Sequence, residues 1–250
     1  MNGASSPLKT QNYDGTLNTV PNYANAITLS DANAATVGAL LPTAFLAPQF
    51  DKGMATLTTP AYSFSTAKTI PTTIKLRAVE TAGDSVSSAT PVTPVEGTAV
   101  IRSGRLQLGS AYGSELLDLP IPLEAQYWAA GGYYTTNRED SLSCTSINPA
   151  SIMLSGFTQN LAACETQFSP TGAQPLVNGR LPLRLLRPGA GNNGSVSLTL
   201  NLGSVAAGST CVSGTASSAT AANLPWFGTN PTARATFGLF KTPLIYRGSR

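Results

Sequence analysis

Apolar and polar residues alternate with a period of two in several stretches of the chain. The clearest stretches are residues 73–78, 121–128, 195–202 and 233–240. A half-buried antiparallel strand produces this alternation, because successive side chains point to opposite faces of the sheet. Turn-forming pairs such as Gly83-Asp84 and Gly131-Gly132 lie between the stretches. The pattern therefore predicts an all-β fold with antiparallel strands.

Helical patterns are weak along the chain. Residues 30–41 are rich in alanine, and Ser30 or Asp31 would suit a helix start. Thr36, Val37 and Gly38 interrupt the stretch, because β-branched residues and glycine disfavour a helix interior. We therefore expect strand and loop here.

Residues 85–97 form the best candidate for a domain boundary. They combine small hydroxyl residues with prolines and contain few large apolar side chains. This composition is typical of a linker or an extended connection. We therefore expect tandem domains, with an Ig-like β-sandwich over residues 1–97 and a larger β-sandwich over residues 98–250. The alternative is a long loop inside one domain.

The composition indicates a protein of the cell surface or the extracellular space. Charged residues make up 11% of the chain, against roughly 25% in typical soluble domains. Solubility must then come from hydroxyl and amide groups, as in bacterial extracellular β proteins. The net charge is only +3 and the basic residues occur singly, so we expect no nucleic-acid partner. No apolar run approaches the roughly 18 residues of a membrane span.

The chain contains no histidine. This excludes histidine-based triads, the commonest general base and most zinc and copper sites. The acidic residues are dispersed, and no pair stands out at the spacing of a glycosidase. We therefore expect a protein that is not an enzyme, with no catalytic residue, cofactor or metal. A calcium ion at Glu80 and Asp84 is a weaker alternative.

Two short motifs have structural interpretations that we favour. Residues 189–194 match the G-x-G-x-x-G fingerprint, but the next residues alternate like a strand, whereas a dinucleotide site needs a helix there. We expect a hairpin loop in which glycines supply positive φ angles. Residues 65–68 match Ser-x-x-Lys, but the accompanying Lys-Thr-Gly is missing.

The three cysteines are Cys144, Cys164 and Cys211. In an oxidising compartment, a Cys144–Cys164 disulfide would close a modest loop and contribute about 3 kcal/mol. Cys211 would then be left over, or would replace one of the two. The alternative is three reduced, buried thiols.

Aromatic residues are the candidate ligand contacts. Tyr133, Tyr134 and Trp226 lie in or near turn-rich sequence, and exposed aromatic rings can stack on sugars. The alternative is that they pack in the core and in hairpins.

Several ordered strings resemble a known family. They are residues 101–106, 111–116, 122–128, 190–196, 224–226, 230–238 and 244–246, and the upstream part, including 11–13 and 50–86, is similar as well. Together they resemble the C-terminal region of MshQ-type proteins, which belong to the mannose-sensitive haemagglutinin (MSHA) type IV pilus system of Gram-negative bacteria.

The resemblance implies a non-enzymatic extracellular module in pilus biogenesis or surface adhesion. Its partners would be pilus or cell-surface proteins. Residues 1–6 lack the features of a signal peptide, so we expect the chain to be a fragment of a longer secreted precursor. The alternatives are a carbohydrate-binding module of a secreted adhesin and, less favoured, a hydrolase domain.

Three charged residues within the resembling strings have structural interpretations. Arg105 and Glu115 flank one segment, and we expect them to form an ion pair that fixes a hairpin. Arg234 lies between Ala233 and Ala235, which we expect to face inward. We expect Arg234 to bond strand-end carbonyls.

Overall fold

The computed structural model is all-β, as the alternation predicts. Its described elements are strands β1 to β19 and two 3₁₀ segments, η1 (Ala47–Gln49) and η2 (Pro149–Ser151). The structure describes residues 12–15, 23–34, 37–41, 43–56, 61–83, 86–89, 95–139, 146–203, 210–212, 215–217, 222, 224 and 227–238.

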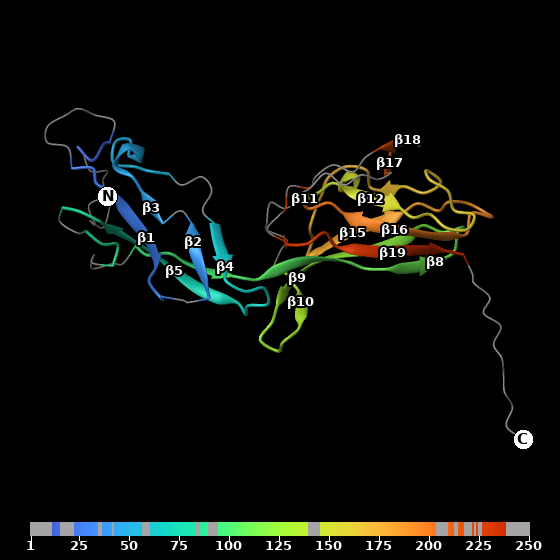
Figure 1. The fold of residues 1–250 in the computed structure, drawn as a ribbon, viewed down its shortest axis with the longest axis horizontal. Helices are drawn as coiled ribbons and strands as arrows, with labels where there is room; N and C mark the ends of the chain where they lie inside the picture. Colours follow the sequence, from blue (N-terminus) through green and yellow to red (C-terminus); the bar gives the residue numbers. More distant parts are fainter. Residues whose placement is uncertain are drawn as a thin grey trace, which may run out of the picture. The chain divides into compact units, whose positions relative to one another are not determined.

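The chain divides into two compact units (Figure 1). Unit 1 comprises Met1–Ser103 and Trp128–Tyr133, and unit 2 comprises Gly104–Tyr127 and Tyr134–Arg250. The predicted boundary near residue 98 falls at the start of β6, which pairs with β5 inside unit 1.

Unit 1 contains a four-stranded antiparallel sheet and a separate hairpin. The sheet has the order β3-β1-β5-β6, from β1 (Ile27–Asp31), β3 (Ala44–Phe45), β5 (Thr72–Glu80) and β6 (Thr98–Ile101). The hairpin consists of β2 (Gly38–Leu41) and β4 (Ala61–Phe64). Residues 30–41 therefore contribute two strand segments and no described helix, as expected.

Few apolar side chains are buried in the described part of unit 1. Phe50 and Ile74 are buried, and the Phe50 ring packs on Tyr13 with 4.9 Å between centroids. Glu80 is buried as well, and it accepts hydrogen bonds from Tyr13 Oη at 3.4 Å and Asn25 Nδ2 at 3.0 Å. The described part of unit 1 thus buries a hydrogen-bonded carboxylate beside few apolar side chains.

Unit 2 is built from two larger sheets that face each other. One has the order β10-β9-β15-β13 with β7 also on β9, from β7 (Gly104–Leu108), β9 (Leu119–Trp128), β10 (Tyr134–Thr136), β13 (Phe168–Ser169) and β15 (Arg180–Leu185). The other has the order β12-β16-β19-β8, from β8 (Ala111–Gly113), β12 (Ile152–Ser155), β16 (Gly194–Leu200) and β19 (Thr232–Phe237). Two small pairs, β11 (Ser146–Ile147) with β14 (Gln174–Pro175) and β17 (Thr210–Val212) with β18 (Thr215–Ser217), complete the described strands.

One apolar core lies between these two sheets. Its members come from both layers, including Ile121 and Leu185 on one side and Leu198 and Phe237 on the other. The inward and outward residues alternate along β9, β16 and β19 in the phase that the sequence predicts. The shared core makes unit 2 a β-sandwich.

Two prolines lie in β9, although β9 has paired strands on both sides. Pro122 is the register partner of Pro182 on β15. Neither residue has an N–H, so this pair must be one at which the two strands exchange no hydrogen bond. On the other side of β9, the β7 ladder ends at the Leu108–Leu123 pair, and Gly109 N donates to Pro122 O at 2.7 Å. The prolines therefore fit without a broken ladder.

The glycine-rich residues 189–194 connect β15 to β16, which belong to different sheets. The hairpin predicted for this loop is therefore wrong. Gly189, Gly191 and Gly194 have φ angles of 99°, 87° and 156°, so the expected positive angles are present. The loop carries the chain from one layer of the sandwich to the other.

Candidate functional site

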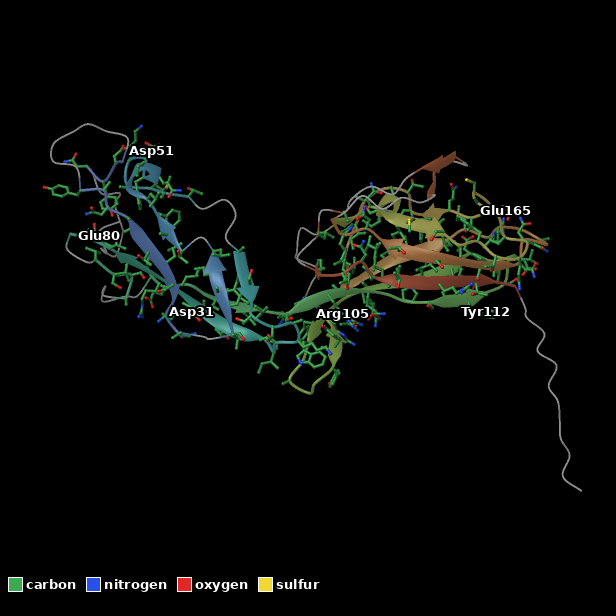
Figure 2. The ribbon with its side chains drawn as sticks, in the orientation of Figure 1. Asp31, Asp51, Glu80, Arg105, Tyr112 and Glu165 are labelled. Carbon is green, nitrogen blue, oxygen red and sulfur yellow. The ribbon has the colours of Figure 1, made fainter. Side chains whose placement is uncertain are left out.

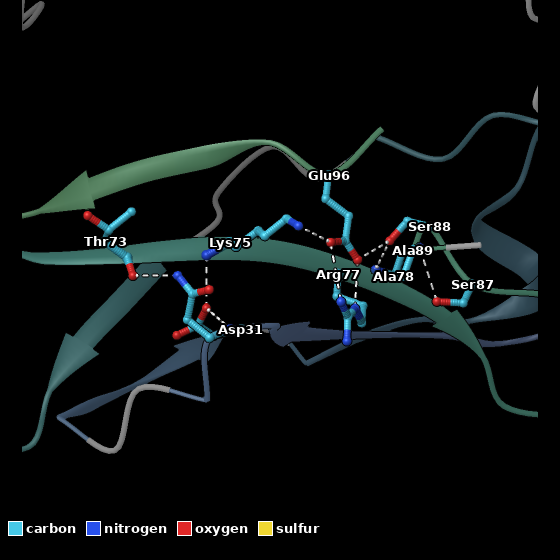
Figure 3. A network of polar contacts seen from close by, with 10 residues as sticks. Asp31, Thr73, Lys75, Arg77, Ala78, Ser87, Ser88, Ala89 and Glu96 are labelled. Atoms are coloured by element: carbon cyan, nitrogen blue, oxygen red, sulfur yellow. Dashed lines mark hydrogen bonds and ion pairs between the residues drawn. The ribbon is translucent and has the colours of Figure 1, made fainter. Parts of the chain in front are cut away.

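Glu96 is the centre of a polar network in unit 1 (Figure 3). Its side chain is 1% exposed, with Arg77 Nε donating to Oε1 at 2.6 Å and Lys75 Nζ lying 2.9 Å from Oε2. Ser88 Oγ donates to the same carboxylate at 3.2 Å and accepts from Ala78 N at 2.9 Å. The described residues of the expected linker are thus bonded to β5 and form a connection inside unit 1.

The network continues to Asp31 at the end of β1. Asp31 Oδ1 accepts from Lys75 N at 2.8 Å and from Asn33 N at 3.0 Å. Asn33 Nδ2 donates to Thr73 O at 3.0 Å, again on β5. The side chains of Asp31 and Asn33 therefore bond main-chain groups of β5 and fix the end of β1 to that strand.

We expect acid to weaken unit 1 through Glu96. Hydrogen bonds from Arg77 and Lys75 lower its pKa to about 2, from an ordinary value of 4.5. Below that ordinary value the unfolded chain takes up a proton that the folded chain does not, so stability falls as the pH drops from about 5 to about 2. Unfolding followed by circular dichroism at several pH values measures the loss, and Glu96→Gln should flatten it. An equally steep fall in Glu96→Gln would contradict the assignment.

A second polar network covers the outer face of the β9 sheet in unit 2. Arg105 Nε and Nη2 both donate to Gln126 Oε1 at 3.0 Å, and the guanidinium lies 3.7 Å from the centroid of the Tyr134 ring. Gln126 Nε2 donates to Glu124 Oε2 at 3.2 Å. Figure 2 labels Arg105 on this sheet. Arg105 is therefore fixed between an amide and an aromatic ring.

Glu124 closes the same network. It accepts from Thr136 Oγ1 at 2.9 Å and from Arg180 Nε at 3.0 Å. Burial alone would raise the pKa of Glu124, but the hydrogen bonds from Thr136 and Gln126, together with the Arg180 charge, outweigh it and lower the pKa. A carboxylate held ionised in this way suits a structural ion pair better than a general acid.

The structure gives both arginines contacts that differ from the expected ones. Arg105 bonds to Gln126 and stacks on Tyr134, and no ion pair to Glu115 is found among the described residues. Arg234 Nε donates to Ser195 Oγ at 2.8 Å, so it contacts a hydroxyl group on β16 where a strand-end carbonyl was expected. In both cases the partner lies on a neighbouring strand set by the register.

The candidate aromatic residues lie in different surroundings. Tyr133 is 61% exposed at the turn after β9. Tyr134 is half-buried, and Arg105 covers one face of its ring. Trp226 lies outside the described residues. Of the three candidate rings, the described residues therefore show one that is exposed and one that is covered on one face.

Cys164 is disulfide-bonded. Because the chain has three cysteines, its partner within the chain is Cys144 or Cys211. Cys144 lies outside the described residues, and for Cys211 only the backbone, in β17, is described. The proposed Cys144–Cys164 pairing stays a prediction.

The remaining sequence motifs are the possible calcium site and the Ser-x-x-Lys match. Asp84, the second expected calcium ligand, lies outside the described residues, and the described part of the chain places no three acidic or cysteine side chains around one point. Lys68 of the Ser-x-x-Lys match has a φ of 65° and lies 5.1 Å from the Trp128 ring centroid. Over the described residues, no helix has the length and apolarity to cross a bilayer.

Two exposed leucines of unit 2 lie next to each other in the turn between β8 and β9. Leu116 and Leu117 are 52% and 67% exposed. Leu117 also lines an open hollow of about 690 Å³ together with Asp118, Leu186 and Arg187. We call these five residues the corner. Tyr112, labelled on β8 in Figure 2, is a further exposed ring shortly before this turn.

The end of the β9–β15 ladder holds the corner in place. The last register pair is Leu119 with Leu185, and the strands separate beyond it. Across the gap, Arg187 N donates to Asp118 Oδ1 at 3.1 Å. Gly189 N donates to Glu115 O at 3.0 Å and ties the following loop to the turn. These hydrogen bonds therefore fix the backbone that carries Leu116 and Leu117.

Sequence reasoning did not identify this corner. The signal was present, since Leu116-Leu117 is an apolar pair between two strands and outside the alternating pattern. Leu186 and Arg187 lie far from it in the sequence, and only the register of β9 with β15 brings them there.

Comparison with protein families identifies the second part of the chain. Residues 102–249 match the family model described as DUF6701, fourth domain. A search of curated proteins found no match, and neither did a search of solved structures. The matched residues cover more than half of the chain, and they begin close to the first residue of unit 2. The chain therefore belongs to the DUF6701 family, of which it contains the fourth domain.

Proposed function

We propose that this chain is a non-enzymatic extracellular module of a surface protein that serves MSHA-type pilus biogenesis or cell-surface adhesion, and that it docks protein partners through the corner. The observation that carries the docking role is the pair Leu116 and Leu117, exposed beside a hollow on a unit whose sheets otherwise bury their apolar faces. Exposed apolar patches of this kind mark interaction sites.

Other observations support the location and the absence of catalysis. Disulfides persist in oxidising compartments, and Cys164 is disulfide-bonded. A fourth domain implies a family of several domains, as expected for a large surface protein. The pKa of Glu96 is lowered by Arg77 and Lys75, and that of Glu124 by hydrogen bonds from Thr136 and Gln126 and by Arg180, whereas a general acid needs a raised pKa.

A deletion strain of the bacterium that encodes the chain tests this function. We expect the strain to lose piliation or adhesion, and the wild-type gene to restore it. The double variant Leu116→Ser/Leu117→Ser should reach the cell surface, as protease accessibility on intact cells shows, yet fail to restore the phenotype. Val177→Ser, which alters an exposed apolar residue elsewhere in unit 2, should restore it.

Three results would contradict the proposal. Normal piliation and adhesion in the deletion strain would contradict the biological role. Full restoration by the double leucine variant would show that the corner is not needed for it. Protease protection on intact cells would contradict the extracellular location.

A further inference from the structure

We propose that the hollow at the corner binds the free carboxyl terminus of a partner polypeptide whose last residue is apolar. The terminal carboxylate would lie on the Arg187 guanidinium, and the last side chain between Leu117 and Leu186. This inference rests on the proposed function, because it names the chemistry of the partner that the corner docks.

The charges at the corner favour an anion. Asp118 is occupied, since its Oδ1 accepts from the main-chain N–H of Arg187 and its Oδ2 lies 3.9 Å from Arg184 Nη1. The Arg187 side chain is exposed, and the described residues place no carboxylate at ion-pair distance from it. The residues at the corner, with the neighbouring Arg184, therefore carry two guanidinium groups and one carboxylate. A guanidinium binds a carboxylate through two parallel hydrogen bonds.

The leucines add a requirement for an apolar group beside that anion. Leu117 and Leu186 line the same hollow as Arg187, and a small inorganic anion would leave both in water. The volume of about 690 Å³ is that of a pocket for a ligand or a short chain segment, roughly 300–1,000 Å³.

A chain terminus meets both requirements within one residue. Its carboxylate and its last side chain leave the same Cα, so they reach Arg187 and the leucines from a single position. An internal aspartate or glutamate would bring main chain on both sides of it into the hollow. Capture of a terminal carboxylate is a recurrent mode of peptide recognition.

Fluorescence anisotropy on the full chain tests the inference. The probe is the fluorescein-labelled peptide Gly-Ser-Gly-Ser-Val-Leu with a free carboxylate, compared with the same peptide as a C-terminal amide. We expect the amide to bind at least about tenfold more weakly, because a charge-assisted hydrogen bond contributes about 1.5–3 kcal/mol. Arg187→Gln should weaken the acid to the same extent, and Arg187→Lys should weaken it less.

Arg180→Gln is the matched control, since Arg180 is an exposed arginine at the start of β15, outside the hollow. It should bind the acid like the wild type, and denaturant curves should show that all variants are folded. Equal binding of acid and amide, equal binding by Arg187→Gln, or no saturable binding at millimolar peptide would overturn the inference. If laurate displaces the peptide and the peptide binds equally well as acid and as amide, the ligand is not a polypeptide terminus. None of these results touches the phenotype of the leucine variant in cells, which tests the proposed function separately.

Discussion

Replacing Phe237 by alanine should lower the free energy of unfolding of unit 2 by about 3–5 kcal/mol. Phe237 is 0% exposed at the end of β19, where it is paired with Gly194 of β16 and Gly113 of β8. Its ring belongs to the core that the two sheets share. Alanine would leave a cavity between the layers, because the surrounding side chains relax only partially into the space.

Urea unfolding followed by far-ultraviolet circular dichroism measures this change. Tyr112→Ala is the control, because it removes a large ring from an exposed position on β8, the strand that also pairs with β19. We expect that control to change stability by about 1 kcal/mol or less. Equal effects of the two substitutions would contradict a shared core between the sheets.

The sequence predicts the strands well because the alternation of apolar and polar residues indicates directly which side chains face the core. Ala233, Ala235 and Phe237 alternate with polar residues, and the structure turns these three toward the core. Local sequence does not report which strand becomes the neighbour. The parallel pairing of β19 with β8 joins residues far apart in the chain, and no local pattern encodes it.

The errors at the glycine loop and at Arg105 share this cause. A turn between two alternating segments usually makes a hairpin, but β15 and β16 bury their apolar faces from opposite layers. Arg105 was paired with Glu115, which is close in sequence. The antiparallel register instead sets Arg105 opposite Gln126, and the same sheet brings Tyr134 beneath it.

The corner shows a different limit of sequence reasoning. Leu116 and Leu117 stand out in the sequence as an apolar pair outside the alternating pattern, but the sequence alone does not show whether a leucine in a turn is exposed or packed in the core. Their exposure depends on where β8 ends and β9 begins. The ligand chemistry depends on Arg187, which the ladder between β9 and β15 carries to the same end of the sheet.

Loss of the Cys164 disulfide should lower the free energy of unfolding of unit 2 by about 2–5 kcal/mol. All three cysteines lie in unit 2, so the disulfide closes a loop within it and restricts its unfolded chain. Cys164→Ser measured beside the wild type in urea gives the value. A reducing agent should destabilise the wild type by a similar amount and leave Cys164→Ser unchanged. If the agent has no effect on the wild type, the disulfide contributes nothing to its stability.

A tryptic digest analysed by mass without reduction distinguishes the two possible partners of Cys164. No lysine or arginine lies between Glu139 and Arg180, so trypsin releases Cys144 and Cys164 on a single peptide. Cys211 lies on a different peptide, residues 185–234, because trypsin cleaves poorly at Arg187-Pro188. If Cys144 is the partner, reduction leaves the two peptides separate as before, and Cys144→Ser but not Cys211→Ser reproduces the loss of stability. A non-reduced mass that joins the two peptides would instead assign Cys211, and would mean that the disulfide ties the β17 segment to the loop after β12.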